Sequence, residues 1–229
     1  MLGLFLYIYY MTISEIYDLF KDCNGVTTDS RSIHKDNMFF SLKGPNFNGN
    51  KYAKSAIEKG AKYAIVDDKE YAFDSQYIVV NDSLETLQKL SNYHRNISNI
   101  KVIGITGSNG KTTSKELINS VLKTSYNTVY TKGNLNNHIG VPLSMLEIKA
   151  DSEIAIIEMG ANHIGEIAFL CEICNPDFGY ITNFGKAHIE GFGNENGVIK
   201  GKKELYDFII NKMGLIFLNN DAVSYTHLT

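Results

Sequence analysis

The sequence predicts an α/β protein of two domains, in which a small N-terminal α/β domain precedes a domain built on a mainly parallel sheet. Three observations support this fold class. A chain of 229 residues exceeds the roughly 100 to 200 residues of one typical domain. The hydrophobic content of 44% and the charged content of 21% are those of an ordinary globular protein. From residue 100 onward, apolar β-like runs alternate with helical segments, which is typical of βαβ crossovers.

The N-terminal domain, residues 11–98, is predicted from short apolar runs separated by polar turns. Apolar residues at helical spacing indicate an opening helix from residue 13. A turn rich in Gly, Pro and Asn occupies 44–50, and Asp82 or Ser83 caps the last helix. We expect strands at 26–29, 38–42, 62–66 and 77–80, and further helices at 52–59 and 83–95.

The second domain, residues 99–221, shows a more regular alternation. Crossovers between parallel strands place helices on both faces of the sheet. Ligands of such sheets bind beyond the carboxyl ends of the strands, so the functional residues are expected in the loops that follow strands. We expect strands at 101–105, 128–131, 153–158, 178–182 and 215–218, and helices at 111–123, 141–147, 164–174 and 197–211.

Composition and charge exclude several classes of protein. A net charge of −3 leaves no broad basic surface for nucleic acid. The apolar segment 1–10 lacks a basic leader and a cleavage site and is too short to span a membrane, so we expect translation to start at Met11. Three cysteines fit a reducing cytoplasm, and Cys171-Glu-Ile-Cys174 is interpreted as core packing because no second Cys/His pair stands at zinc spacing.

The strongest local signal is an apolar strand that runs into a glycine-rich turn and a helix over residues 101–113. The pattern predicts a phosphate-binding loop, because helix-terminal amides hold anions, a lysine reaches the outer phosphates and a threonine hydroxyl ligates Mg²⁺. The common pattern has glycine where this chain has Ile105, so the loop is a variant. The residues expected to hold the nucleotide are Gly107, Ser108, Asn109, Gly110, Lys111, Thr112 and Thr113.

Two further candidates follow predicted strands. Glu158 ends the apolar run that begins at residue 154, and a carboxylate there is expected to hold Mg²⁺ against the phosphates rather than simply face water. His188, in Asn183-Phe-Gly-Lys-Ala-His188, lies in the same layer of loops and is a candidate ligand of metal or phosphate. A lone loop histidine is more often solvated, and chemistry alone does not rank His138 or His163 beside it.

The helix predicted at 197–211 carries an unusual pair of residues, because Lys202 and Lys203 fall in the middle of its apolar stripe. The expected stripe consists of Val198, Ile199, Leu205, Tyr206, Ile209 and Ile210. Such a lysine either extends to water, which is the commoner outcome, or serves a site where burial lowers its pKa. Lys200 lies off the stripe and is expected to be solvated.

Together these motifs resemble the Mur ligases, a family of ATP-dependent ligases of peptidoglycan precursor synthesis. The resemblance covers about residues 12–221. Two of its motifs point to the branch of the family that joins D-alanyl-D-alanine to UDP-N-acetylmuramoyl-tripeptide. The resemblance rests on 106–112, on Gly133-Asn-Leu-Asn-Asn-His-Ile-Gly-Val-Pro142, on Glu158-Met-Gly-Ala-Asn-His-Ile-Gly-Glu166 and on 183–193.

The resemblance implies a role for each candidate residue. Lys111 and Thr112 would hold the phosphates of ATP and Mg²⁺, and Glu158 and His188 would be further metal ligands. Lys202, with Lys203 as its rival, matches a lysine that CO₂ converts to a carbamate, which would hold a second Mg²⁺. Asn137 resembles a residue near the nucleotide. The motif Thr28-Asp-Ser-Arg31 and the loop 44–49 resemble the uridine-binding loops of the family. Ser30 and Arg31 are the expected contacts with the uridine nucleotide. Asn48 and Asn50 stand where many relatives carry Asp and His.

The implied reaction transfers the γ-phosphoryl group of ATP to the tripeptide carboxylate, and the dipeptide amine then attacks the acyl phosphate. We also expect a cytoplasmic monomer. Relatives continue through the rest of the central domain into a third domain, so we expect a truncated chain whose residues 1–10 and 222–229 are non-native. Two alternatives stay open: another Mur-type or folylpolyglutamate-type ligase, and a nucleotide-binding module without ligase activity.

Overall fold

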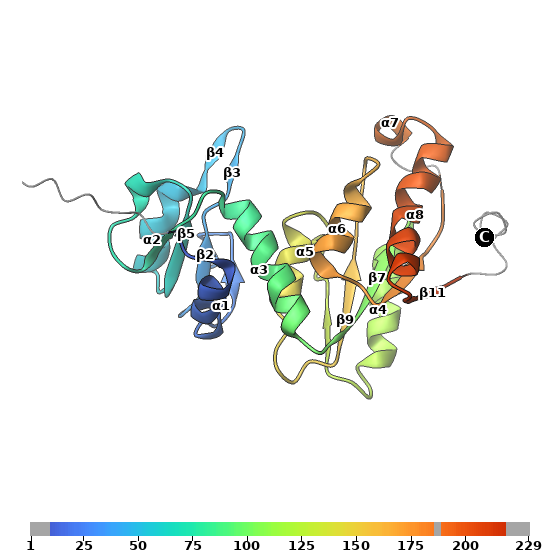
Figure 1. Cartoon of the computed structure of the whole chain (residues 1–229), viewed down its shortest axis with the longest axis horizontal. Coiled ribbons are helices and arrows are strands. Elements are labelled where there is room, and N and C mark those ends of the chain that lie inside the picture. The colour runs from blue at the N-terminus through green and yellow to red at the C-terminus, as the bar shows by residue number, and fades with distance from the viewer. Residues whose placement is uncertain (1–9, 186–188, 219–229) are drawn as a thin grey trace, which may run out of the picture. The chain divides into compact units, whose positions relative to one another are not determined.

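The computed structural model describes residues 10–185 and 189–218, which belong to two compact units (Figure 1). Unit 1 ends at Tyr93 and unit 2 begins at His94, so the boundary lies inside helix α3 (Ser83–Ile97). The domain boundary predicted from the sequence lies just after this helix, at residue 98. The last turn of α3 belongs to unit 2 because the Arg95 side chain donates hydrogen bonds to the carbonyl oxygens of Cys174 and Asn175.

Unit 1 is built on a four-stranded parallel sheet in the order β1-β2-β5-β6. Its first helix begins with a reciprocal cap, in which the Thr12 hydroxyl accepts from the Glu15 amide and the Glu15 carboxylate accepts from the Thr12 amide. Each helix and strand expected between 11 and 98 is present, and the strands are shorter than expected. The elements are α1 (Ile13–Lys21), β1 (Val26–Thr27), β2 (Met38–Phe40), the 3₁₀ turn Gly49–Tyr52, α2 (Ala53–Glu58), β5 (Tyr63–Val66), the 3₁₀ turn Lys69–Tyr71, β6 (Tyr77–Val79) and α3.

The turn expected at 44–50 contains a short antiparallel hairpin, β3 (Lys43–Gly44) and β4 (Phe47–Asn48). Strands of two residues are too short to show an alternating pattern, so periodicity could not predict them. The chain leaves the hairpin at Gly49, where a Cβ would lie 2.4 Å from the Leu42 carbonyl oxygen. Glycine is required there for the backbone to close.

Unit 2 is a five-stranded sheet in the order β11-β10-β7-β9-β8, and each pair of neighbouring strands is parallel. The expected alternation is confirmed, with a short additional helix before α8. The elements are β7 (Lys101–Thr106), α4 (Lys111–Leu122), β8 (Thr128–Tyr130), α5 (Gly140–Met145), β9 (Ile154–Glu158), α6 (Glu166–Cys174), β10 (Phe178–Ile181), α7 (Ile189–Phe192), α8 (Glu195–Asn211) and β11 (Leu215–Phe217).

The core of unit 2 lies between the sheet and the helices α5, α6 and α8. Cys171 and Cys174 are buried in this core, where both sulfur atoms lie about 4 Å from that of Met159, which confirms their interpretation as packing residues. Helix α4 packs against β7, β8 and β9, and its buried residues are Lys115 and Asn119 rather than apolar side chains. The polar inner surface of α4 therefore meets the sheet at the edge where ligands are expected.

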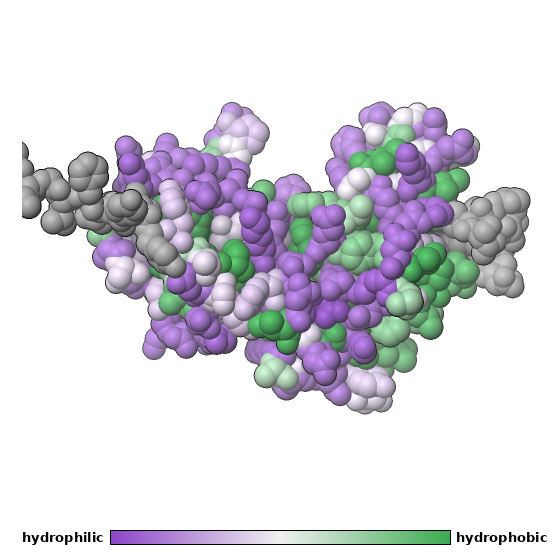
Figure 2. Space-filling model, viewed as in Figure 1, coloured by the Kyte–Doolittle hydropathy of each residue, from purple (hydrophilic) through white to green (hydrophobic). Residues whose placement is uncertain are grey.

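The surface of unit 2 carries apolar residues near β11. Figure 2 shows them gathered around β11 and the adjacent part of α8, where Ile210, Leu215 and Phe217 are about half exposed. Ile210 was expected on the inner stripe of α8, but it points outward because the stripe is narrower than the sequence pattern indicated. An edge strand with exposed apolar side chains is typical of a contact surface. No helix in the described part of the chain is long and apolar enough to cross a membrane.

Replacing Arg95 with alanine is expected to lower the free energy of unfolding of unit 2 by about 2 to 4 kcal/mol. The buried guanidinium forms an ion pair with Asp177 at 2.9 Å, and the same carboxylate accepts from the Val102 amide at the centre of the sheet. Urea unfolding measures the loss. The matched control is Lys89→Ala on the same helix, which removes only an exposed pair with Glu85 and should cost about 0.5 kcal/mol or less. Equal losses in the two variants would contradict the prediction.

Candidate active site

The loop between β7 and α4, residues 107–110, is called the phosphate loop after the role that the sequence predicts for it. It needs glycine at two positions. Gly107 has a φ of +142°, and a Cβ there would lie 2.0 Å from the Thr182 hydroxyl oxygen. Gly110, with a φ of +76°, directly precedes the first residue of α4, Lys111. The amides of the first turn of a helix have no partner inside it, so the loop presents donors and the positive helix end at one place.

The chain after β10 supports this loop. The Asn183 side chain accepts from the Asn109 amide and donates to the Asn109 carbonyl oxygen. The Ser108 hydroxyl donates to the Gly185 carbonyl oxygen at 2.8 Å. The amide of Asn109 is therefore bonded within the protein, which leaves the first turn of α4 as the main source of amides for an anion.

Lys111 closes over the phosphate loop. Its ammonium donates to the carbonyl oxygens of Gly107 at 2.8 Å and Ser108 at 3.3 Å. Burial lowers the pKa of the Lys111 amine, and the nearby Glu158 carboxylate acts in the opposite direction. The amine is held at the loop by weak neutral acceptors, so an arriving phosphate would be a stronger partner.

Glu158 ends β9 with its carboxylate almost fully buried. One carboxylate oxygen accepts from the Thr112 hydroxyl at 3.0 Å, and the other accepts from the Asn136 side-chain amide at 2.9 Å. Its backbone amide donates to the Thr131 hydroxyl. The structure therefore brings Glu158 and Thr112, two of the expected site residues, into direct contact.

The pair formed by Thr112 and Glu158 fits a magnesium ion. Mg²⁺ takes oxygen ligands at 2.0 to 2.1 Å in an octahedron, so two adjacent ligands lie about 3 Å apart. The Thr112 hydroxyl and the nearer Glu158 oxygen lie 3.0 Å apart. Within residues 10–185 and 189–218, no three His, Cys, Asp or Glu side chains converge on a metal site. This donor set suits an ion that is held by one or two protein groups together with phosphates and water.

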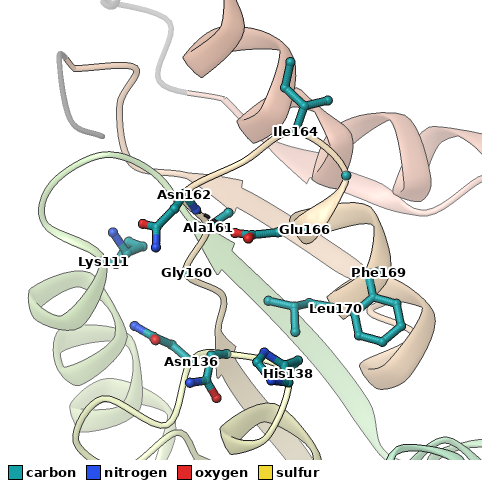
Figure 3. A pocket seen from close by; sticks show the side chains of 12 residues that line it. Lys111, Asn136, His138, Gly160, Ala161, Asn162, Ile164, Glu166, Phe169 and Leu170 are labelled. Carbon is teal, nitrogen blue, oxygen red and sulfur yellow. Dashed lines mark hydrogen bonds between the residues drawn. The ribbon is translucent and has the colours of Figure 1, made fainter. Parts of the chain in front are cut away.

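A cavity of about 700 Å³ opens beside Lys111 (Figure 3). In the close view, Lys111 lies at one side of the cavity, Asn136 and His138 project from one wall, and Asn162 and Glu166 project from the opposite wall. The cavity is lined by Lys111, Asn136, Asn137, His138, Gly160, Ala161, Asn162, Ile164, Gly165, Glu166, Phe169 and Leu170. It is large enough for part of a peptide or a sugar next to the phosphate loop.

Lys202 is buried at the edge of this site. It is 1% exposed, its amine donates to the carbonyl oxygen of the lining residue Ala161 at 3.1 Å, and the Phe192 ring covers it at 5.1 Å. The pKa of Lys202 is lowered to about 8, mainly by burial and then by the positive charge of Lys111, while Glu166 and Glu204 oppose the shift. Lys203 instead forms an ion pair with Asp207, and Lys200 is exposed as expected. Of the two neighbouring lysines, the geometry therefore favours Lys202.

The remaining expected residues are placed as follows. Asn137 lines the cavity, but its side-chain oxygen caps α5 by accepting from the amides of Ile139 and Gly140. Thr113 is exposed beside Thr112. His188 lies outside the described residues.

The two candidates in unit 1 lie in the turn after β1. The Arg31 side chain forms a bidentate ion pair with Asp29, whose carboxylate also accepts from the Arg31 amide. This pair lowers the pKa of Asp29 to about 2. The Ser30 carbonyl oxygen accepts from Lys59 at 2.7 Å. Arg31 is exposed, so its guanidinium is available at the surface although it is held by Asp29.

Sequence reasoning missed two residues of the site in unit 2. Asn136 binds the Glu158 carboxylate, whereas the neighbouring Asn137 was chosen. Asn183 ties down the phosphate loop, although it was quoted only as part of a motif. The position of Asn183 in a loop that follows a strand of the sheet could have found it, whereas the same kind of position does not separate Asn136 from Asn137.

Comparison with known proteins identifies the family of this chain. A model of the Mur ligase middle domain matches residues 105–229, which is more than half of the chain, and one of the Mur ligase family catalytic domain matches residues 22–95. The chain belongs to the Mur ligase family. The two matched regions of this Mur ligase chain correspond to unit 2 and to most of unit 1.

Individual Mur ligases resemble this one over most of its length. The UDP-N-acetylmuramoyl-tripeptide–D-alanyl-D-alanine ligase of Bacillus subtilis is 37% identical over 87% of this chain and 44% of that protein. The enzyme of the same name from Escherichia coli is 34% identical over 92% of this chain and 48% of that protein. The present Mur ligase chain therefore spans about half the length of the relatives it matches.

Solved Mur ligase structures share the fold. A crystal structure of MurF from Acinetobacter baumannii superposes with a TM-score of 0.77 at 32% identity, over 91% of this chain and 48% of that one. MurF from Thermotoga maritima, solved in complex with ADP, gives a TM-score of 0.74 at 33% identity, over 83% of this chain and 44% of that one. These likenesses confirm the α/β fold with parallel sheets.

Proposed function

We propose that this chain forms the substrate- and ATP-binding part of a ligase that joins D-alanyl-D-alanine to UDP-N-acetylmuramoyl-tripeptide. The observation that carries the proposal is the constellation at the end of the central strands, where Lys111, the Thr112 hydroxyl and the Glu158 carboxylate meet at the phosphate loop. The relatives named for this reaction, at 34 to 37% identity, support the choice of substrates.

The chemistry proposed for this site begins with attack by a carboxylate oxygen of the tripeptide on the γ-phosphorus of ATP. The bond between that phosphorus and the β–γ bridging oxygen breaks, and ADP leaves. The dipeptide amine then attacks the acyl carbon and loses a proton, and the bond from carbon to phosphate breaks. A carboxylate and a triphosphate repel one another, so the site must concentrate positive charge where they meet.

The residues of unit 2 fit that requirement. Lys111 would move from the carbonyl oxygens of Gly107 and Ser108 to the outer phosphates. Thr112 and Glu158 would hold Mg²⁺, which when bound would neutralise charge on the phosphates. The cavity beside Lys111 would accept the peptide end of the uridine-linked substrate, with its carboxylate toward the phosphate loop. In unit 1, Ser30 and Arg31 would contact the uridine nucleotide.

We further propose that the amine of Lys202 is converted to a carbamate. Its nitrogen would attack the carbon of CO₂, an N–C bond would form and a proton would leave. This needs a neutral amine, which burial favours by lowering the pKa of Lys202 to about 8. The product carries two oxygens and a negative charge, so it could hold a cation that an ammonium repels.

Three unpaired cysteine thiols support a cytoplasmic location.

The test is a phosphate-release panel on the complete protein encoded by the gene. Release from ATP is expected only when UDP-N-acetylmuramoyl-tripeptide and D-alanyl-D-alanine are both present. Each substrate is omitted in turn, and single amino acids are offered in place of the dipeptide. Equal release with a single amino acid would contradict the proposed substrates, while absence of release in every combination would favour a nucleotide-binding module.

A further inference from the structure

Helix α4 buries a lysine that has no role in the proposed reaction. Thr112, Lys115 and Asn119 follow one another at intervals of three and four residues, so they share the inner face of the helix. Lys115 is 0% exposed. Burial of an ammonium is unfavourable unless it is paired, so its partners must account for its presence.

The partners of Lys115 link the helix to the edge of the sheet that holds the site. Its amine donates to the Thr131 carbonyl oxygen at 2.6 Å and lies 3.1 Å from the Glu116 carboxylate. It also lies 3.9 Å from the carboxylate oxygen of Glu158 that accepts from Thr112. Lys115 therefore contacts the strand end on one side and the candidate metal ligand on the other.

Thr131 extends this link to the backbone of Glu158. The Thr131 carbonyl oxygen accepts from Lys115, and its hydroxyl accepts from the Glu158 amide at 2.9 Å. The Thr131 amide donates to the Ile156 carbonyl oxygen. Thr131 is fully buried, so these bonds are protected from water. Lys115 is thus linked through Thr131 to the main chain of Glu158 and lies 3.9 Å from its carboxylate, whose two oxygens accept from Thr112 and Asn136.

We propose that Lys115 is a positioning residue for magnesium, which holds the Glu158 carboxylate beside the Thr112 hydroxyl before the ion binds. This inference rests on the proposed function, in which Glu158 and Thr112 are the protein ligands of Mg²⁺. Two effects of Lys115 oppose one another, because its charge repels the cation while its contacts preorganise the ligands. The proposal requires the second effect to be the larger, which fixes the sign of the result.

The experiment measures the dissociation constant of ADP by calorimetry on the complete protein, once with EDTA and once with Mg²⁺. The constant in EDTA divided by the constant in Mg²⁺ is the gain in ADP affinity that the metal provides, called here the magnesium gain. In Lys115→Met, which removes the amine from a chain of similar length, this gain is expected to fall about tenfold while the constant in EDTA stays unchanged. A general loss of structure would instead weaken binding in both conditions.

Asn119→Ala supplies the matched control. Asn119 is the other buried residue of α4, and its side chain accepts from the Thr128 hydroxyl at 2.8 Å, so it joins the same helix to the same strand away from Glu158. This variant should lose thermal stability and keep the magnesium gain. If Lys115→Met does not fold, Lys115→Leu, which also removes the amine and its N–H donors, should show the same reduced gain.

The outcomes separate the inference from the function on which it rests. An unchanged or larger magnesium gain in the Lys115 variants, beside a normal gain in the unmodified protein, would overturn the positioning role alone. An equal fall of the magnesium gain in Asn119→Ala would also overturn the positioning role. Absence of any magnesium gain in the unmodified protein would overturn both the inference and the proposed metal site.

Discussion

Replacing Lys111 with alanine is expected to lower ligase turnover by roughly 10² to 10³-fold, because the variant loses the cation that would meet the developing charge on the transferred phosphoryl group. The amine already lies at the phosphate loop, bonded to the Gly107 carbonyl oxygen, so no rearrangement of the fold is needed to bring it there. Phosphate release by the complete protein, with all three substrates at saturation, measures the effect.

The matched control for Lys111 is Lys101→Ala. Lys101 begins β7, is exposed and lies at the opposite end of the strand from the phosphate loop. Its loss should leave turnover near that of the unmodified protein. If Lys111→Ala retained a similar rate, the phosphate loop would have no part in the reaction.

Replacing Lys202 with alanine is expected to lower turnover by about 10²-fold, and a short-chain carboxylic acid should restore part of the activity. The added carboxylate would occupy the space that the shortened side chain leaves and would supply the oxygens of the missing carbamate. Lys203→Ala is the control, since Lys203 is paired with Asp207 and should be dispensable. Full activity of Lys202→Ala without the added acid would exclude the carbamate.

The carbamate also predicts a direction of pH dependence in the unmodified protein. Burial places the pKa of Lys202 at about 8, below the usual value for lysine, so the neutral amine accumulates as the pH rises through 8. After removal of CO₂ and its return at a fixed concentration, the rate at which activity recovers should therefore rise with pH and level off above about 8. A rate that fell over this range would contradict the assignment.

Sequence periodicity predicted nearly all of unit 2 because each strand there consists of three to six mostly apolar residues bounded by polar turns. It failed for the hairpin β3–β4, whose two-residue strands have no pattern, and for α7, whose four residues are too few. It also placed Ile210 inside, since apolar spacing on α8 does not reveal how wide a surface the sheet and α6 cover.

The residues of the candidate site likewise include some that the sequence could predict and some that it could not. Lys111, Thr112 and Glu158 could be predicted because a turn of fixed geometry and a strand end determine their positions. Lys115 and Asn136 could not, because their roles depend on which side chains of other elements approach them. A lysine four residues into an amphipathic helix gives no sign in the sequence that it will meet a buried carboxylate, and two adjacent asparagines differ only in the direction that the loop gives them.

The order of strands in the two sheets has a consequence for how the chain acquires its structure during synthesis. In unit 1, strands that are neighbours in the sheet also follow one another along the chain, so the sheet can form soon after residue 79 has emerged from the ribosome. In unit 2, Ile103 pairs with Phe178, a separation of 75 residues, and the Thr182 and Asn183 contacts of the phosphate loop come later still. Contacts between distant residues form slowly. Unit 1 should therefore be folded while the central strand β7 of unit 2 still lacks its neighbour β10.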